Sequence, residues 1–178
     1  MCIRDRTEAP PFDADFFGAE LAHTRRWALE RDGRTPLPPD RSALWEELAG
    51  RLARDAADPA LVGDPVPTHR DFHANNLMRT DDGALAVIDF QDLRFGPPDY
   101  DAVSLRFERA GALAPAHGDA YAESVLLQRA WKVLGTFEKM LALDREVYRP
   151  HRDAAARAVR LWTRPDGPYR PLLAFLPG

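Results

Sequence analysis

One short polar segment, His69 to Asn76, constrains the fold of this chain more than any other stretch. It reads H-R-D-F-H-A-N-N and is followed by two short apolar runs on either side of Asp81-Asp82-Gly83. Because an Asp-Gly pair tolerates the positive φ angles of a tight turn, the two runs predict a β-hairpin. The hairpin would bring Asp89, at the end of its second strand, back to Asn76 at the start of its first.

The side chains of this segment suit phosphoryl transfer to a hydroxyl group. Asp71 offers a carboxylate that can accept a hydrogen bond from an attacking hydroxyl and orient it. The amide oxygen of Asn76 and the carboxylate of Asp89 are hard ligands suited to Mg²⁺, with water and phosphate completing its coordination. ATP is then the expected phosphate donor. Each residue alone would more often be a turn or cap residue. We interpret His69 as a structural residue. The order and spacing of Asp71, Asn76 and Asp89 after it, rather than any one residue, favour phosphoryl transfer.

Two alternative functions remain open at this point. His69-x-Asp71-x-His73 alternates like a metal-binding strand edge, which would suit a zinc hydrolase. That interpretation leaves Asn76 and Asp89 without a role. The other histidines are scattered over segments expected to be helices or loops: His23, His117 and His151. The second alternative is a folded but inactive binding module.

The remainder of the chain is expected to be mostly α-helical. Apolar spacing predicts helices over residues 12–33, 40–58, 100–109, 119–143 and 152–162, with a short one after Pro168. Residues 59–67 are expected to be a connector. Residues 1–11 are expected to be an irregular lead-in, and whether residues 1–6 are native is open. Lys132, on the long helix 119–143, could reach a substrate or lay its aliphatic stem along the surface, and we expect the second.

Composition excludes several other classes of protein. The 178 residues are enough for one domain with a core, and the net charge of −4 argues against a nucleic-acid-binding module. The single cysteine, Cys2, excludes a disulfide within the chain and a cysteine-based zinc site. No apolar run approaches the ~20 residues of a membrane span, and the charged start is unlike a signal peptide. We therefore expect a cytoplasmic protein that does not bind membranes.

The segment from His69 to Leu77, together with Val87 to Asp92, resembles the aminoglycoside phosphotransferase and choline kinase-like family. Gly96-Pro97-Pro98-x-Tyr100-Asp101 extends the resemblance. The resemblance implies that Asp71 is the catalytic residue and that Asn76 and Asp89 bind Mg²⁺ and, through it, ATP. It also implies that Asp101 anchors the catalytic loop, with His69 as further structural support of the site.

Within that family, the chain is most similar to bacterial kinases that phosphorylate the anomeric hydroxyl of N-acetylmuramate and N-acetylglucosamine in cell-wall recycling. The similarity rests on Arg70, on Asp89-Phe90-Gln91-Asp92 and on the stretch from Gln128 to Phe137. It implies an amino sugar as the small-molecule partner, with His73, Gln91 and Asp92 as candidate substrate contacts. An aminoglycoside or another small alcohol is the alternative acceptor. A protein acceptor is less expected, because Gln91 stands where protein kinases have the glycine of D-F-G.

Kinases of this family also carry an N-terminal lobe with a strand-borne lysine and a loop over the ATP phosphates. No segment before residue 69 has that pattern. We therefore expect residues 12–178 to form a kinase-like C-terminal lobe, mostly α with a small β-hairpin (α+β), with the N-terminal lobe missing and no activity alone. Apolar surface should then be exposed near the start of the chain and around the motif loop. The oligomeric state stays open.

Overall fold

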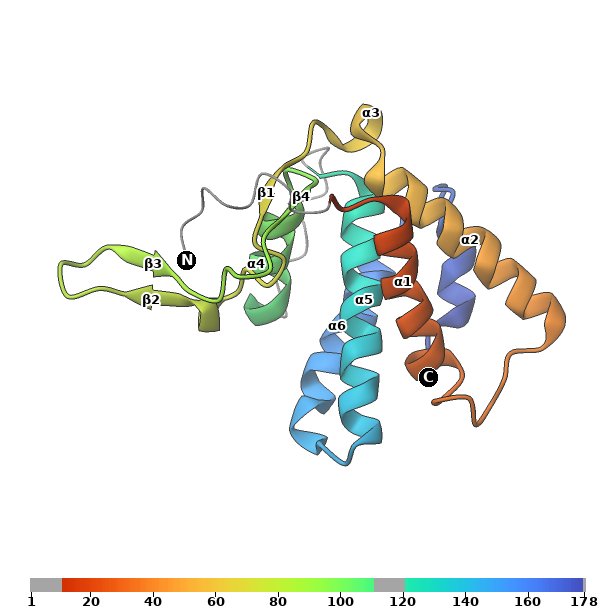
Figure 1. Ribbon diagram of the computed structural model, residues 1–178. Helices are drawn as coiled ribbons and strands as arrows, with labels where there is room; N and C mark the ends of the chain where they lie inside the picture. Colours follow the sequence, from red (N-terminus) through yellow and green to blue (C-terminus); the bar gives the residue numbers. More distant parts are fainter. Residues whose placement is uncertain (1–10, 111–120, 178) are drawn as a thin grey trace.

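The computed structural model describes residues 11–110 and 121–177. Figure 1 shows helices gathered around one long central helix, α5, with a β-hairpin projecting to one side. The helices are α1 (Ala14–Thr24), which continues as a π-helical turn η2 (Arg25–Leu29), α2 (Pro39–Ala57), α3 (Pro59–Val62), η3 (Ala74–Asn76), α4 (Tyr100–Ala110), α5 (Glu123–Ala142), η4 (Glu146–Tyr148), α6 (Arg149–Trp162) and η5 (Arg170–Phe175). The strands are β1 (Val66–Thr68), β2 (Leu77–Arg79), β3 (Leu85–Val87) and β4 (Arg94–Gly96).

The core lies where α1, α2 and α6 pack against α5. Trp45 of α2 meets Trp131 of α5 edge to face, with ring centroids 5.2 Å apart, and Phe175 of η5 packs on the other side of Trp45 at 5.3 Å. Both tryptophans are almost completely buried. These large aromatic contacts stabilise the helical body, since each ring removes a large apolar area from water. The predicted mostly α-helical fold is confirmed.

α1 and α5 approach each other closely at Gly135. A Cβ atom at this position would lie only 2.6 Å from Cα and 2.7 Å from Oγ1 of Thr24. The Thr24 hydroxyl donates a hydrogen bond to the carbonyl oxygen of Trp131, at 2.9 Å. The absence of a side chain at Gly135 therefore sets the spacing of the two helices.

The beginning of the described chain is tied to the core. Phe12 stacks on Phe16 at 4.8 Å and packs edge to face on Tyr100 at 5.0 Å. Its backbone N–H donates to the carbonyl oxygen of Phe95 at 2.7 Å. Phe12 and Phe17 are both buried. The expectation of exposed apolar surface near the chain start is therefore wrong for these rings, because Tyr100 and β4 cover them.

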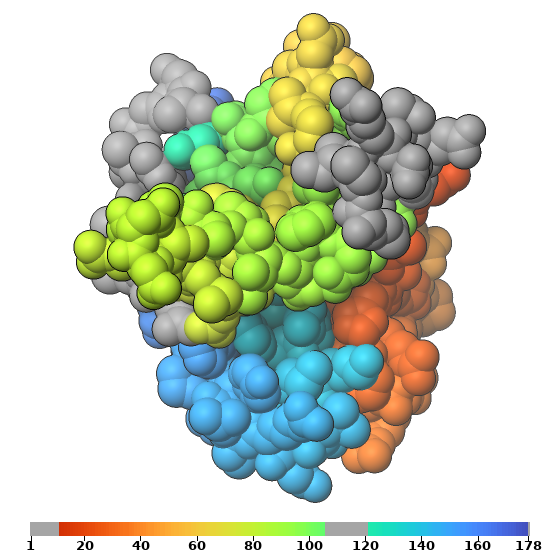
Figure 2. Space-filling view, turned by 60° about the vertical axis from the view of Figure 1, so that its left-hand side comes forward, coloured from red at the N-terminus to blue at the C-terminus, as the bar shows by residue number. Residues whose placement is uncertain are grey.

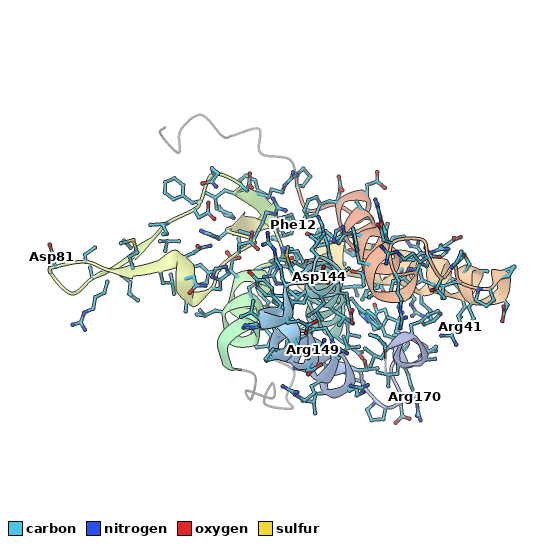
Figure 3. The ribbon with its side chains drawn as sticks, turned by 90° about the horizontal axis from the view of Figure 1, so that it is seen from below. Phe12, Arg41, Asp81, Asp144, Arg149 and Arg170 are labelled. Carbon is cyan, nitrogen blue, oxygen red and sulfur yellow. The ribbon has the colours of Figure 1, made fainter. Side chains whose placement is uncertain are left out.

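The hairpin β2–β3 has the predicted form. The strands pair antiparallel with Leu77 opposite Val87, and Gly83 in the turn has a φ of +85°. The hairpin projects from the helical body, with Asp81 at its tip far from the labelled residues of the helices (Figures 1 and 3). Its apolar side chains are exposed, as expected around the motif loop: Met78, Leu85, Val87, Ile88 and Phe90.

A second sheet was not predicted. β1 pairs antiparallel with β4, with Pro67 opposite Phe95. Two strands of three residues each, one of them containing a proline, carry too little periodicity to be recognised in sequence. The segment 59–67, expected to be a connector, thus contains α3 and the start of β1.

Three helix boundaries differ from the sequence expectation by three residues or more. α5 begins at Glu123 rather than at 119, a position outside the described residues, and α6 begins at Arg149 rather than at 152. The first helix ends at Leu29 instead of 33. None of the helices among the described residues has the length and apolar character needed to cross a membrane.

Candidate functional site

The loop that begins at His69 is held by a carboxylate from the first turn of α4. Asp101 accepts hydrogen bonds from the backbone N–H groups of His69, at 2.6 Å, and Arg70, at 3.0 Å. Burial raises the pKa of Asp101 above its ordinary value, while these two N–H donors oppose that rise. Arg70 has a φ of +75°, a strained conformation for a residue with a side chain. The two hydrogen bonds hold the loop in this conformation.

His69 and Asn76 join the loop to the hairpin. Nε2 of His69 lies 2.8 Å from the carbonyl oxygen of Ile88. The Asn76 amide Nδ2 donates to the carbonyl oxygen of Asp71 at 2.8 Å, and the Asn76 carbonyl accepts from the N–H of Ile88 at 3.0 Å. Asn76 therefore lies beside both the Asp71 backbone and the strand end that precedes Asp89.

The Asp71 carboxylate faces two cations from α5. Its Oδ1 atom lies 3.6 Å from Nζ of Lys132 and 3.9 Å from Nη2 of Arg129. Burial alone would raise the pKa of Asp71, but Lys132, Arg129 and the more distant Arg70 together lower it below its ordinary value. The Asp71 side chain is still 53% exposed, so a substrate can reach it. The expectation that Lys132 only covers surface is wrong, because its ammonium reaches this carboxylate.

Arg129 is the site residue that sequence reasoning missed. Its side chain is completely buried, and its guanidinium lies over the ring of Tyr100 at 5.4 Å. Burial also raises the pKa of the Tyr100 hydroxyl. A buried cation needs compensating negative charge, which Asp71 provides. The available signal was an arginine followed by a lysine three residues later on one face of an apolar helix.

The remaining candidates lie around the exposed Asp89. This residue has a φ of +64°, and Nε2 of Gln91 donates a hydrogen bond to its Oδ1 atom. Asp92 lies at the edge of the site, with its carboxylate 4.0 Å from the Arg70 guanidinium. The half-buried His73 precedes η3, and its carbonyl accepts from the N–H of Asn76 at 2.9 Å. These candidates thus lie on the loop and on the segment that follows β3, beside residues that contact Asp71 or Asn76.

The donor set fits a magnesium ion better than a zinc ion. Asn76 and Asp89 offer an amide oxygen and a carboxylate, and Mg²⁺ is commonly held by one or two such protein groups together with phosphates. Within residues 11–110 and 121–177, no cluster of three histidine, cysteine or acidic side chains is arranged to hold a metal. The ring nitrogen Nε2 of His69 is already occupied by the Ile88 carbonyl. The described part of the chain therefore gives the zinc-hydrolase alternative no support.

The loop after His69 thus carries the half-exposed Asp71 carboxylate, and the base of the hairpin carries Asn76 and Asp89. The chain belongs to the phosphotransferase enzyme family, whose sequence profile matches residues 4–135. The resemblance stated from the motifs is confirmed at this level.

Curated relatives are similar over different shares of the chain. An N-acetylmuramate/N-acetylglucosamine kinase of Neisseria meningitidis is 28% identical over 94% of this chain and 56% of its own length. The protein of that name from Pseudomonas aeruginosa is 31% identical over 54% of this chain and 27% of its own length. A third, from Pseudomonas putida, is 29% identical over the same shares. The chain thus spans about half the length of the Neisseria relative, 56% of it.

Proposed function

We propose that this chain provides the acceptor-binding and metal-binding part of an ATP-dependent small-molecule phosphotransferase, with residues 12–178 as a kinase-like C-terminal lobe. The observation that carries the proposal is the Asp71 carboxylate. It is half exposed, it is compensated on Oδ1 by Lys132 and Arg129, and it belongs to a loop held by Asp101. Such a carboxylate is ionised and fixed in place, as a hydrogen-bond acceptor for a reacting hydroxyl must be.

The roles of the residues follow from their positions. Both cations approach Oδ1 of Asp71, and we assign Oδ2 to the acceptor hydroxyl, whose proton it would accept as the oxygen attacks phosphorus. Asn76 and Asp89 would hold Mg²⁺, which when bound offsets the negative charge of the nucleotide phosphates. Gln91, hydrogen-bonded to Asp89, would restrict the orientation of that carboxylate.

The proposed acceptor is the anomeric hydroxyl of an N-acetylated amino sugar. Support comes from the relatives, which are N-acetylmuramate/N-acetylglucosamine kinases. His73 and Asp92 lie near enough to the Asp71 loop to serve as sugar contacts, and we propose them as such. An aminoglycoside or another small alcohol is the competing acceptor of the same family.

The test uses the full-length protein that the gene encodes. Sugar- and ATP-dependent release of ADP is measured for the wild type and for Asp71→Asn, which keeps the shape of the side chain and removes its charge. We expect kcat to fall about 10² to 10⁴-fold, with an unchanged circular dichroism spectrum. Asp81→Asn, at the hairpin tip, is the matched control and should retain full activity.

Other outcomes would contradict parts of the proposal. Retained turnover in Asp71→Asn would exclude the assigned role of this residue. Turnover of aminoglycosides but of neither amino sugar would exclude the sugar acceptor. If no acceptor of a broad alcohol panel were phosphorylated by the full-length wild type, the phosphotransferase proposal itself would be wrong.

A further inference from the structure

The chain has only two lysines, and both lie on one face of α5. Lys132 and Lys139 are seven residues apart among 24 basic residues, the rest of which are arginines. Residues seven apart lie on the same side of a helix, roughly 10 Å apart along its axis. In Figure 2 the surface of α5 (teal) recedes beneath the overhanging hairpin, with α1 beside it. The first lysine is the one that faces Asp71.

The second lysine lies against an aromatic ring from the neighbouring helix. Nζ of Lys139 is 5.8 Å from the centre of the Trp27 ring, and the Arg26 guanidinium is 5.3 Å from the same ring. The ring of His23 has its centroid 6.3 Å from that of Trp27. We refer to Lys132, Lys139, His23 and Trp27 as the lysine strip. It runs from Asp71 along the junction of α1 and η2 with α5, where Gly135 brings the helices together.

Three basic side chains surround His23 in the lysine strip. The pKa of His23 is lowered, first by burial and then by the charges of Lys139, Arg26 and Lys132, with Glu20 opposing. A cationic histidine is therefore disfavoured at this point, and a neutral imidazole can donate or accept hydrogen bonds.

Two of the nearby carboxylates are paired with arginines, whereas Glu20 keeps its negative charge beside the strip. Asp32 pairs with Arg26 at 2.6 Å. Glu138 pairs with Arg152 at 3.6 Å, and Glu20 accepts a hydrogen bond from Gln128 at 2.7 Å. Among the described residues, no ion pair to a carboxylate of the chain is formed by Lys139. An anionic ligand would supply a carboxylate partner for Lys139.

Resting on the proposed function, we propose that the lysine strip binds the carboxylate of an acidic amino sugar whose reacting hydroxyl lies at Asp71. Lys132 would lie near the reacting end, and Lys139, two helical turns away, would pair with the carboxylate. The Trp27 ring, beside Lys139, would add an apolar contact for the sugar. The strip would thus favour an acceptor that carries a carboxylate, such as N-acetylmuramate, over its uncharged counterpart N-acetylglucosamine.

The kinetic test compares these two sugars with the full-length protein. Lys139→Met should raise the ratio of KM for N-acetylmuramate to KM for N-acetylglucosamine about tenfold, because a charge-assisted contact is lost. Lys139→Arg should keep the ratio within about twofold, since the charge remains. Arg157→Met removes an exposed charge on α6 and is the matched control, with no change in the ratio.

The two proposals fail in different ways. An unchanged KM ratio in Lys139→Met, with both sugars turned over by the wild type, would overturn the lysine strip and leave the phosphotransferase proposal intact. Absence of turnover of either sugar by the wild type would overturn the proposed function instead.

A second measurement does not depend on activity. Reductive ¹³C-methylation of this chain labels its two lysines and its amino terminus and preserves their charge. Titration with N-acetylmuramate should shift the Lys139 methyl resonance, assigned through Lys139→Arg, and N-acetylglucosamine should shift it several-fold less. Equal shifts with the two sugars, or none with either, would contradict carboxylate binding at this position.

Discussion

Two backbone N–H groups, those of His69 and Arg70, depend on the carboxylate of Asp101. Asp101→Ala leaves both donors without their acceptor in a partly buried place. We expect the free energy of unfolding to fall by about 2 to 4 kcal/mol, since each unsatisfied buried donor costs about 1 to 3 kcal/mol. Urea denaturation followed by circular dichroism measures the change. Asp101→Asn keeps one acceptor oxygen and should lose less, and Asp81→Ala at the exposed hairpin tip should lose almost nothing.

The raised pKa of Asp101 gives this residue its own pH dependence. Burial, its main cause, places the folded-state pKa above the ordinary value of 3.8. The folded protein therefore binds the proton more tightly than the unfolded chain. This stabilising contribution is fully present below pH 3.8 and is lost as pH rises through the higher folded pKa. The amide side chain of Asp101→Asn cannot take up this proton. The free energy of unfolding of the variant should therefore fall further below that of the wild type as the pH is lowered from neutral to 4. A deficit that shrinks on acidification would contradict the raised pKa.

Some residues of the site could be placed from sequence and others could not. Asn76 and Asp89 were expected to be close because a tight turn forces the two strand ends together, which is a local constraint. The contact between Asp71 and Lys132 is different in origin. It depends on how α5 packs beneath the loop, and a lysine on an amphipathic helix has the same local pattern whether it faces solvent or a carboxylate.

At the scale of secondary-structure elements, the contact between α1 and α5 is the most sensitive to small changes. Gly135→Ala places a methyl group 2.6 Å from Thr24 Cα, a backbone atom that cannot move away alone. We expect a loss of about 1 to 3 kcal/mol in unfolding free energy from overpacking, measured by chemical denaturation. Gly18→Ala in α1 has open space around the new Cβ and should instead stabilise the helix by about 0.5 to 1 kcal/mol. Equal effects of both substitutions would mean that the helices do not meet at Gly135.

Of the two small sheets, the β2–β3 hairpin could be predicted from sequence and the β1–β4 pair could not. The β2–β3 hairpin is encoded by neighbouring residues, with Gly83 supplying the positive φ of its turn. The pairing of β1 with β4 joins segments separated by the whole motif and hairpin, and Pro67 interrupts the pattern of β1. Such a pairing is specified by tertiary contacts, here including the Phe12 ring that packs on Gly96.

On the scale of the whole molecule, several exposed apolar side chains of the described residues lie together on the hairpin. Met78 is 53% and Leu85 73% exposed. Surface of this kind binds apolar dyes and promotes association. The chain should therefore increase the fluorescence of a dye specific for apolar surface, and Met78→Lys with Leu85→Lys should reduce the signal several-fold.

The control substitutions for this experiment lie just after the C-terminal end of α5. Leu143 and Val147 are also exposed, at 53% and 74%, but they lie away from the hairpin. The double substitution Leu143→Lys with Val147→Lys should leave most of the dye signal. A larger loss from this pair than from the hairpin pair would place the main apolar surface elsewhere.

The hairpin touches the helical body through few groups, and this gives the molecule two levels of local stability. Its ladder amides are covered by little apolar packing, so they should exchange with solvent deuterium through small openings that leave the helices intact. The amides of α5 around the buried Trp131 should exchange only when the whole domain unfolds. Asn76 and Asp89 then lie on the part of the fold that opens most readily, while Arg129 and Lys132 lie on the part that opens last. Substitutions on the proposed metal-binding side of the site should thus cost little stability, whereas substitutions on the cationic side should cost more.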